Sequence, residues 1–180
     1  MFYTVGHSTR SSEEFVALLQ SAGVGALADV RRIPRSGTNP QFNLGNIEAP
    51  LATAGISYRH IAELGGLRSR SKQQTESPNT FWENRSFRNY ADYAATEPFR
   101  EAFNLLCDIG RTQNCAIMCA EAVWWRCHRR IIADYLLAAG EQVFHILSAT
   151  KIEPAKITPG AHVLSGGTLI YPRQTRNEEE

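Results

Sequence analysis

Cys115-Ala116-Ile117-Met118-Cys119 is a run of five residues without a charged or strongly polar side chain. A short apolar run of this kind is typical of a strand that is buried on both faces in a parallel sheet. Downstream, residues 127–139 place apolar side chains at helical spacing, and Gly140 supplies the usual end of a helix. A buried strand that leads into a helix is the repeating unit of α/β folds, so this stretch predicts that fold class.

The N-terminal part of the chain predicts a second unit of the same kind. Residues 2–5 and 25–30 are short β-prone runs, and the helix between them begins where Ser11 and Glu14 have the spacing of a capping box. We therefore predict a single α/β domain over residues 1–172. It has three layers, with a mostly parallel sheet flanked by helices in the style of Rossmann-like and flavodoxin-like folds.

Further segments complete this pattern. Residues 56–61 and 142–147 predict two more strands, and residues 47–54 predict a short helix. Residues 90–109 have a longer helical pattern, which Pro98 is expected to divide because its ring cannot continue a helix.

Three segments are expected to lie outside the main sheet and its helices. Residues 65–89 begin with Gly65-Gly66 and contain a basic run, and their length predicts a lid or insertion loop. Residues 168–171 predict a small edge strand, and residues 173–180 predict a frayed acidic tail.

The composition indicates a globular protein without a strong overall attraction to polyanions. The 180 residues are 43% hydrophobic and 21% charged, and the formal net charge is +1, so any binding of nucleic acid must be local. No apolar run approaches the roughly 18 residues of a membrane span, and residues 1–6 lack the features of a secretory signal. We therefore expect a cytoplasmic protein with no membrane partner. The four cysteines lie close together in the sequence, which favours reduced thiols over a disulfide framework.

Polar side chains follow three of the predicted strands directly. They are, in chain order, His7, Ser8, Asp29, Arg31, Arg32, Cys119 and Glu121. Because the carboxyl ends of parallel strands meet at one edge of a sheet, these side chains are expected to form one composite site. The alternative is that each cluster only caps a helix or forms an ion pair with a neighbour.

One interpretation of this site makes Cys119 a thiolate nucleophile. The following helix, together with Arg126 and Arg129, would lower the pKa of its thiol. The competing interpretation is a buried structural thiol at a strand end. Phosphatase and sulfur-transfer loops place an arginine six positions after the cysteine, whereas Arg126 comes seven positions after it and no glycine lies between, which disfavours that chemistry.

A second interpretation is a metal site. Cys119, Cys127 and His128 offer soft ligands that suit zinc, and Glu121 or His7 could complete a tetrahedron. Seven residues separate the two cysteines, whereas structural zinc knuckles usually have two to four. A reversible disulfide between the same two thiols is a further alternative.

A third interpretation makes the cationic side chains primary. The residues expected to bind a phosphate or carboxylate are Ser8, Arg31, Arg32, Arg126, His128 and Arg129. The residues expected to carry catalysis are His7, Asp29, Cys119 and Glu121. The structural alternative is a buried network in which Asp29 or Glu121 pairs with Arg129 and joins strand to helix.

The basic segment within residues 65–89 gives weak evidence for nucleic acid. Arg68, Arg70 and Lys72 are followed by Trp82, Arg85 and Arg88, so basic and aromatic residues alternate as they do in single-strand binders. A solvated loop explains the same composition.

Five short motifs, each found once, follow one another along the chain in a characteristic order. They are Val5-Gly6-His7-Ser8, Asp29-Val30-Arg31-x-x-Pro34-x-Ser36, Leu64-Gly65-Gly66, Met118-Cys119-Ala120-Glu121 and Cys127-His128-Arg129. Together they resemble the bacterial and archaeal family catalogued as domain of unknown function 488. The resemblance spans most of the chain and implies a single α/β domain with these residues gathered at one site. It implies no established activity.

Two functions from different classes follow. The first is an enzyme that acts on an anionic substrate containing a phosphate or nucleotide, or on a nucleic-acid fragment, at the composite site. The alternative is a metal-binding or nucleic-acid-binding regulatory module that uses Cys119, Cys127 and His128 without catalysis.

Overall fold

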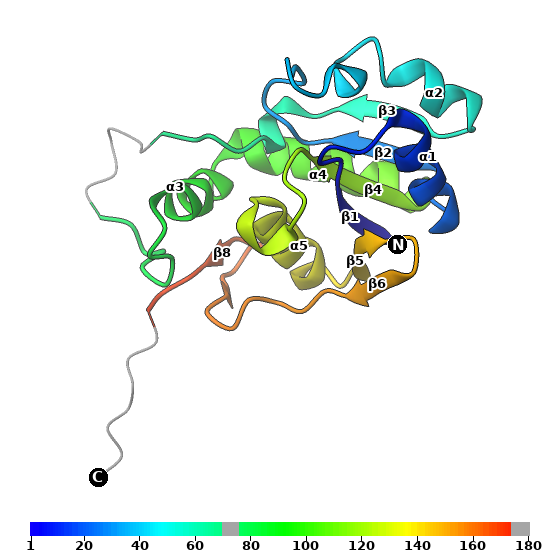
Figure 1. Cartoon of the computed structure of the whole chain (residues 1–180). Coiled ribbons are helices and arrows are strands. Elements are labelled where there is room, and N and C mark those ends of the chain that lie inside the picture. Colours follow the sequence, from blue (N-terminus) through cyan, green and yellow to red (C-terminus); the bar gives the residue numbers. More distant parts are fainter. Residues whose placement is uncertain (70–75, 174–180) are drawn as a thin grey trace.

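The computed structural model describes residues 1–69 and 76–173. Its fold is built around a six-stranded sheet. The strands are β1 (Phe2–Gly6), β2 (Ala26–Asp29), β3 (Ser57–His60), β4 (Cys115–Cys119), β5 (Val143–Ser148) and β6 (Lys151–Pro154). Their spatial order is β3-β2-β4-β1-β5-β6 (Figure 1). The first five strands run parallel, and β6 pairs antiparallel with β5.

The strands predicted from apolar runs form the middle of this sheet. β4 lies between β2 and β1, so the apolar run 115–119 is covered by a strand on each side. Phe2 of β1 lies opposite Cys115 on one side and Val143 on the other. The prediction of one mostly parallel sheet is therefore confirmed, and the carboxyl ends of the strands do meet at one edge.

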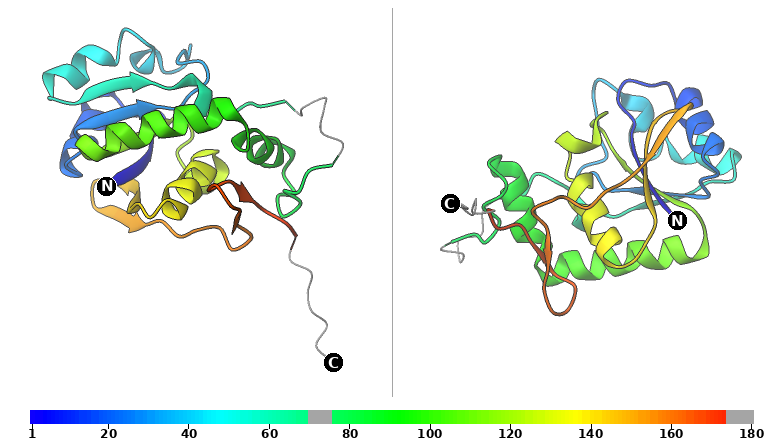
Figure 2. Two further views of the ribbon diagram at one scale, coloured as in Figure 1. Left: turned by 180° about the vertical axis from the view of Figure 1, so that it is seen from behind. Right: turned by 90° about the horizontal axis from the view of Figure 1, so that it is seen from below.

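Helices cover both faces of the sheet, which gives three layers (Figures 1 and 2). They are α1 (Ser12–Ser21), α2 (Glu48–Thr53), α3 (Arg85–Ala94), α4 (Glu97–Thr112) and α5 (Arg129–Ala138), with short 3-10 turns η1 (Pro40–Phe42), η2 (Ala62–Leu64) and η3 (Trp124–Arg126). Buried side chains of α1 and α2 pack on one face, and those of α3, α4 and α5 pack on the other. None of the helices in the described ranges has both the length and the apolar character that crossing a membrane requires.

The helix α1 shows how local sequence produces this arrangement. Ser11 caps its N-terminus, and the side chain of Glu14 accepts from the backbone N–H of Ser11, which completes the predicted capping box. Phe15, Leu18 and Leu19 then form the buried face of the helix.

The strand order places a ligand crevice beside β4. The chain leaves β1 toward α1 on one face of the sheet and leaves β4 toward α5 on the other face. Adjacent parallel strands whose connections diverge in this way leave a crevice at their carboxyl ends, where open α/β folds bind ligands. The sheet is doubly wound as predicted. Its order differs from the Rossmann and flavodoxin orders because β4 is inserted between β2 and β1.

Several predicted elements differ in detail. The helical pattern 90–109 belongs to two helices, and Pro98 lies in the first turn of α4, where its missing N–H costs no hydrogen bond. The predicted small strand at 168–171 is present as β8 (Leu169–Ile170), and it pairs with β7 (His162–Val163) in a separate two-stranded sheet. The antiparallel strand β6 was not predicted.

Part of the predicted lid belongs to the hydrophobic core. Trp82 and Asn79 are buried, and the backbone N–H of Phe81 donates to the carbonyl of Tyr171 at 2.8 Å. Residues 70–75 of the predicted lid and residues 174–180 of the predicted tail lie outside the described residues. That residues 65–89 act as a lid stays a prediction.

The loop that follows β4 passes directly over the end of β1. The backbone N–H of His7 donates to the carbonyl of Cys119 at 2.9 Å, and that of Ser8 donates to Ala120 at 3.1 Å. A Cβ atom on Gly6 would overlap the backbone of Glu121 and lie 2.8 Å from the Cα of Ala122. Only glycine therefore allows this close approach.

We expect Gly6→Ala to lower the free energy of unfolding by about 1–3 kcal/mol, the usual cost of forcing an extra methyl group into a packed site. Urea denaturation of the two proteins measures this difference. Gly37→Ala is the matched control, since a Cβ there meets nothing within 4 Å. Equal stability of the Gly6→Ala and Gly37→Ala proteins would contradict the close approach.

Candidate functional site

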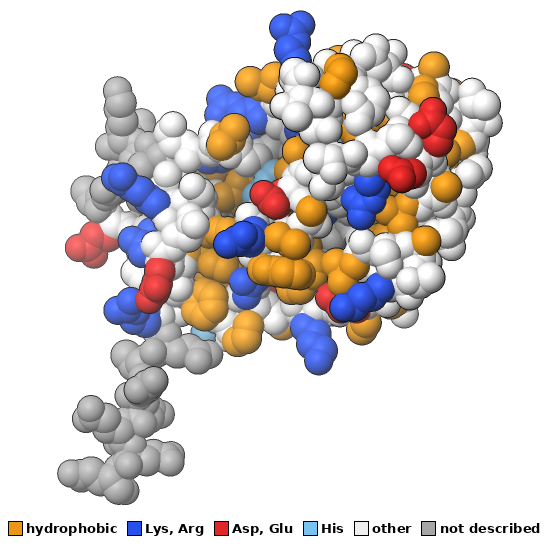
Figure 3. All heavy atoms as spheres, in the orientation of Figure 1, with side chains coloured by type: hydrophobic (Ala, Val, Ile, Leu, Met, Phe, Trp, Pro, Cys, Tyr) orange, Lys and Arg blue, Asp and Glu red, His pale blue; other side chains and the backbone are white. Residues whose placement is uncertain are grey.

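A cavity of about 540 Å³ opens at the carboxyl ends of β1, β2 and β4. Its size lies within the range of small-molecule binding sites. Its walls come from these strand ends, from α3 and from the residues just before α5. Figure 3 shows this face of the molecule, where basic side chains and an acidic side chain surround hydrophobic atoms and a histidine.

A buried ion pair forms the base of the site. Asp29 at the end of β2 is 0% exposed, and the Arg31 guanidinium donates to its carboxylate through Nε at 2.9 Å and through Nη2 at 2.5 Å. The backbone N–H of Arg31 and the Tyr58 hydroxyl also donate to this carboxylate, at 3.0 and 2.7 Å. Burial opposes the charge of Arg31, but the Asp29 carboxylate outweighs it and raises the pKa of Arg31.

His7 at the end of β1 is held neutral beside this pair. Its Nδ1 lies 2.8 Å from the carbonyl oxygen of Ser8, which can only accept, so Nδ1 carries the proton. Its Nε2 then accepts from Nη1 of Arg31 at 3.3 Å, and its ring stacks on Phe42 with centroids 4.2 Å apart. Burial is the main cause that lowers the pKa of His7 to about 4.

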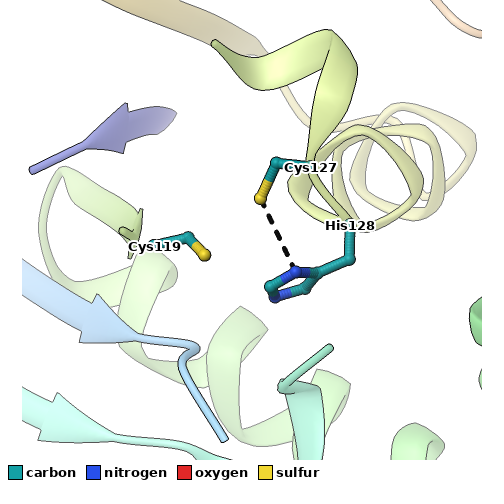
Figure 4. Close-up of side chains that lie close together, drawn as sticks. All are labelled: Cys119, Cys127 and His128. Carbon is teal, nitrogen blue, oxygen red and sulfur yellow. Dashed lines mark hydrogen bonds between the residues drawn. The ribbon is translucent and has the colours of Figure 1, made fainter. Parts of the chain in front are cut away.

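Two thiols and an imidazole meet on the other side of the cavity. The ligand atoms of Cys119, Cys127 and His128 all lie within 4.8 Å of one another (Figure 4). Nδ1 of His128 lies 3.6 Å from Sγ of Cys127, and Nε2 donates to the carbonyl of Val30 at 3.0 Å. A Cβ on Gly66 would come within 2.8 Å of Nδ1 of His128, so glycine leaves room for the ring. These three residues can hold a metal ion.

Arg129 forms a hydrogen bond to the sulfur of Cys127 but is not among the residues that line the cavity. Its guanidinium is 1% exposed, donates through Nε to Sγ of Cys127 at 3.3 Å, and donates through Nη2 to the carbonyl oxygen of Glu121. Within the described ranges, no carboxylate forms an ion pair with it. The alternative in which Asp29 or Glu121 pairs with Arg129 is therefore not what the structure contains, because Asp29 pairs with Arg31 and the backbone of Glu121 contacts Arg129.

The two thiols differ in acidity. The hydrogen bond to Cys127, together with burial, raises the pKa of Cys119 well above its usual value. Burial alone would raise the pKa of Cys127 too, but the Cys119 thiol and the neighbouring His128 and Arg129 hold it well below its usual value. Arg129 acts to lower the pKa of Cys119 as expected, but the hydrogen bond to Cys127 and burial outweigh it.

The mouth of the cavity is basic. Arg32, Arg35 and Arg126 line it, and Glu121 is the one carboxylate among the described lining residues. Nη1 of Arg32 donates to the carbonyl of Leu67 at 2.9 Å, which holds that side chain against the rim. Arg126 was among the residues predicted to bind the anion, whereas Arg35 was not, although it follows the end of β2 in the sequence.

The predicted site residues divide into two groups. The lining residues among them are His7, Arg31, Arg32, Cys119, Glu121 and His128. Ser8, Asp29 and Arg129 are not among the lining residues. They form hydrogen bonds to the lining residues His7, Arg31 and Cys127, respectively. Ser8 has a positive φ of 51°, which an L residue adopts only under constraint, and its N–H is bonded to the loop after β4.

The basic segment predicted for nucleic acid is held by internal contacts. Arg68 donates to the carbonyls of Gly65 and Ala62 and lies over the Tyr93 ring at 3.8 Å. Arg88 donates to the carbonyl of Trp82 at 2.8 Å. Arg70 and Lys72 lie outside the described residues.

Comparison with known proteins identifies a family but no characterised relative. The family model with the description "Domain of unknown function DUF488" matches residues 11–136, from the cap of α1 to the last residues of α5. This segment contains Asp29, Arg31 and both cavity thiols, whereas His7 precedes it. Neither the curated proteins nor the solved structures that were searched contain a match.

Asp29→Asn is expected to lower the free energy of unfolding by about 3–5 kcal/mol, because it leaves the buried Arg31 cation without a carboxylate. Asp108→Asn serves as the control, since its ion pair with Arg111 is exposed and such pairs contribute at most about 1 kcal/mol. Urea denaturation of both variants provides the measurement. A similar small effect for the two variants would contradict the role given to Asp29.

Proposed function

The chain belongs to the DUF488 family of domains of unknown function, and from its site we propose that it is an enzyme acting on an anionic substrate in the cavity beside β4. A phosphate-containing substrate, such as a nucleotide or a nucleic-acid fragment, fits this cavity best. A cytoplasmic location accompanies this proposal, because reducing conditions keep the two cavity thiols free.

The charge balance of the cavity carries the proposal. Among the described residues that line the mouth, Arg32, Arg35 and Arg126 face one carboxylate, that of Glu121. Arg31 adds no net charge because Asp29 neutralises it. Guanidinium groups bind phosphate oxygens through paired hydrogen bonds, so this excess of cations favours an anion at the mouth.

The opposite wall favours a substrate with an apolar or aromatic part. Phe87 and Tyr90 of α3 line the cavity, and Leu67 and Ile33 are strongly exposed beside them. Aromatic side chains stack on nucleobases, and such a contact works with any base. An aromatic wall opposite a cationic rim is therefore suited to a nucleotide.

The reaction chemistry that we propose rests on three sets of residues. Glu121 transfers the proton, because its carboxylate lines the cavity beside the arginines. Cys119 and Cys127 together supply the nucleophilic thiolate in this scheme, because a hydrogen bond joins the two thiols and His128 lies within reach of both. Asp29, Arg31 and His7 position the strand ends, and Ser8 and Arg129 hold the loop that carries Glu121.

Binding of the anion is tested with inorganic pyrophosphate and with adenosine triphosphate, by isothermal titration calorimetry. Arg126→Ala and Arg32→Ala should each weaken binding roughly tenfold or more, since each removes a hydrogen bond between charged groups. Arg111→Ala removes an exposed arginine outside the cavity and should leave binding unchanged. Equal affinities for all three variants would contradict the proposal.

Turnover of a panel of phosphoesters and nucleotides then tests catalysis. Glu121→Gln keeps the shape of the side chain and should retain pyrophosphate binding while it loses turnover. If no member of the panel is turned over in a manner that depends on Glu121 or Cys119, the enzyme proposal fails even where an anion binds.

A second candidate function is zinc binding by a regulatory module without catalysis. It is favoured by the meeting of Cys119, Cys127 and His128, whose ligand atoms lie within 4.8 Å of one another. Two thiolates and one imidazole around a tetrahedral zinc ion lie about 3.8 Å apart, so a small movement would allow coordination. The bond from Nε2 of His128 to the carbonyl of Val30 is the outer contact that metal-binding histidines usually make.

Elemental analysis of the purified protein tests this candidate. We expect about one zinc ion per chain. We expect Cys119→Ser to lose it, because the two protein ligands that remain are too few to hold zinc. Cys115→Ser changes a buried thiol outside the group and should keep the metal. Absence of zinc in protein that also fails to take it up from added zinc would exclude the candidate.

A further inference from the structure

We propose that Cys119 and Cys127 form a dithiol pair that reduces hydroperoxides entering the cavity and is converted to a disulfide in the process. The two residues come from different elements, the end of β4 and the segment just before α5, yet both line the cavity. A small molecule in the cavity can therefore reach either sulfur.

The geometry brings the two sulfurs close together but leaves them short of bonding distance. Both belong to a group of atoms within 4.8 Å of one another, and the side chains point toward one another in Figure 4. A disulfide requires about 2.0 Å between the sulfurs. The connection between the two residues runs through a loop and the short turn η3, so no long helix or strand opposes a small closing movement.

The first step oxidises Cys127. Its sulfur attacks the outer oxygen of the hydroperoxide, the O–O bond breaks, and the thiol proton leaves with the alcohol, so that the thiol becomes a sulfenic acid. Arg129 donates through Nε to this sulfur at 3.3 Å, and Nδ1 of His128 lies 3.6 Å from it. The Arg129 contact stabilises negative charge on the sulfur, and Nδ1 of His128, which is free to accept because Nε2 donates to Val30, can take the thiol proton and pass it to the departing oxygen.

The second step consumes the neighbouring thiol. The sulfur of Cys119 attacks the sulfenic sulfur of Cys127, a disulfide forms, and water leaves with the Cys119 proton. An external dithiol then reduces the disulfide and restores both thiols. The overall change is one hydroperoxide reduced to an alcohol and water, with two thiols of the external dithiol oxidised.

The two remaining cysteines provide an internal comparison. Cys107 and Cys115 do not line the cavity, and Cys107 is no more buried than Cys127, so position in the cavity and not burial separates the two pairs of cysteines. Burial raises the pKa of Cys107 to about 11 and that of Cys115 to about 12, so both stay protonated. Reaction confined to the other two cysteines would thus reflect their position and not general oxidation.

The experiment treats the full-length protein with one equivalent of hydrogen peroxide, both as purified and after a chelator has removed bound metal. The chelated sample matters because a bound metal would shield both sulfurs. Free thiols are then alkylated under denaturing conditions and counted by intact mass spectrometry, and peptide mapping identifies any linked pair. We expect two of the four thiols to be lost, with Cys119 linked to Cys127.

Variants separate the two steps. Cys119→Ser should leave a sulfenic acid on Cys127 that a cyclic diketone probe traps, and Cys127→Ser should abolish the rapid loss of thiols. Cys107→Ser and Cys115→Ser should form the linked pair as the natural protein does. Because the wild-type peptide map is decisive by itself, a variant that fails to fold does not remove the test.

The proposal is overturned if both samples keep four free thiols, or if Cys107 or Cys115 is oxidised at the same rate as Cys127. A sulfinic acid on Cys127 without a link to Cys119 would overturn it too. Anion binding and zinc content are measured separately, so either can hold while this inference fails.

Discussion

The buried ion pair of Asp29 and Arg31 is the interaction on which the site depends. Two charges taken out of water are stable only when further hydrogen bonds satisfy them. Here Tyr58 of β3 adds a bond to the carboxylate, while His7 after β1 and the carbonyl of Phe42 accept from the guanidinium. The pair therefore joins the end of β2 to three other segments, which are β3, the residue after β1 and the turn η1. It also neutralises Arg31, so the charge of the cavity comes from the arginines of its rim.

Close backbone approach is the second constraint on the site. The loop after β4 can cross the end of β1 because Gly6 has no side chain, and the ring of His128 fits because Gly66 has none. Arg129 then binds both the carbonyl of Glu121 and the sulfur of Cys127, which fixes the loop to the start of α5. A carboxylate, two thiols and an imidazole thus face one cavity although the motifs that contain them are spread through the chain.

Much of this arrangement could be predicted from the sequence, and the errors have a common cause. The apolar run 115–119 and the capping box at Ser11 predicted elements that the structure contains, and the rule that parallel strands end at one edge predicted the convergence of His7, Arg31 and Cys119. The wrong predictions concern partners. Asp29 pairs with Arg31 and not with Arg129, which instead contacts the sulfur of Cys127 and the carbonyl of Glu121.

The sequence by itself determined where strands and helices form and which polar residues follow them, because hydrophobic periodicity and caps depend on residues a few positions apart. Only the tertiary structure decided which guanidinium meets which carboxylate and which sulfur lies beside Arg129. Those contacts join residues that are distant in the chain or compete for one partner, and differences of a few ångströms determine the charge of a buried group. For the same reason, the insertion of β4 between β2 and β1 was visible only in the folded chain.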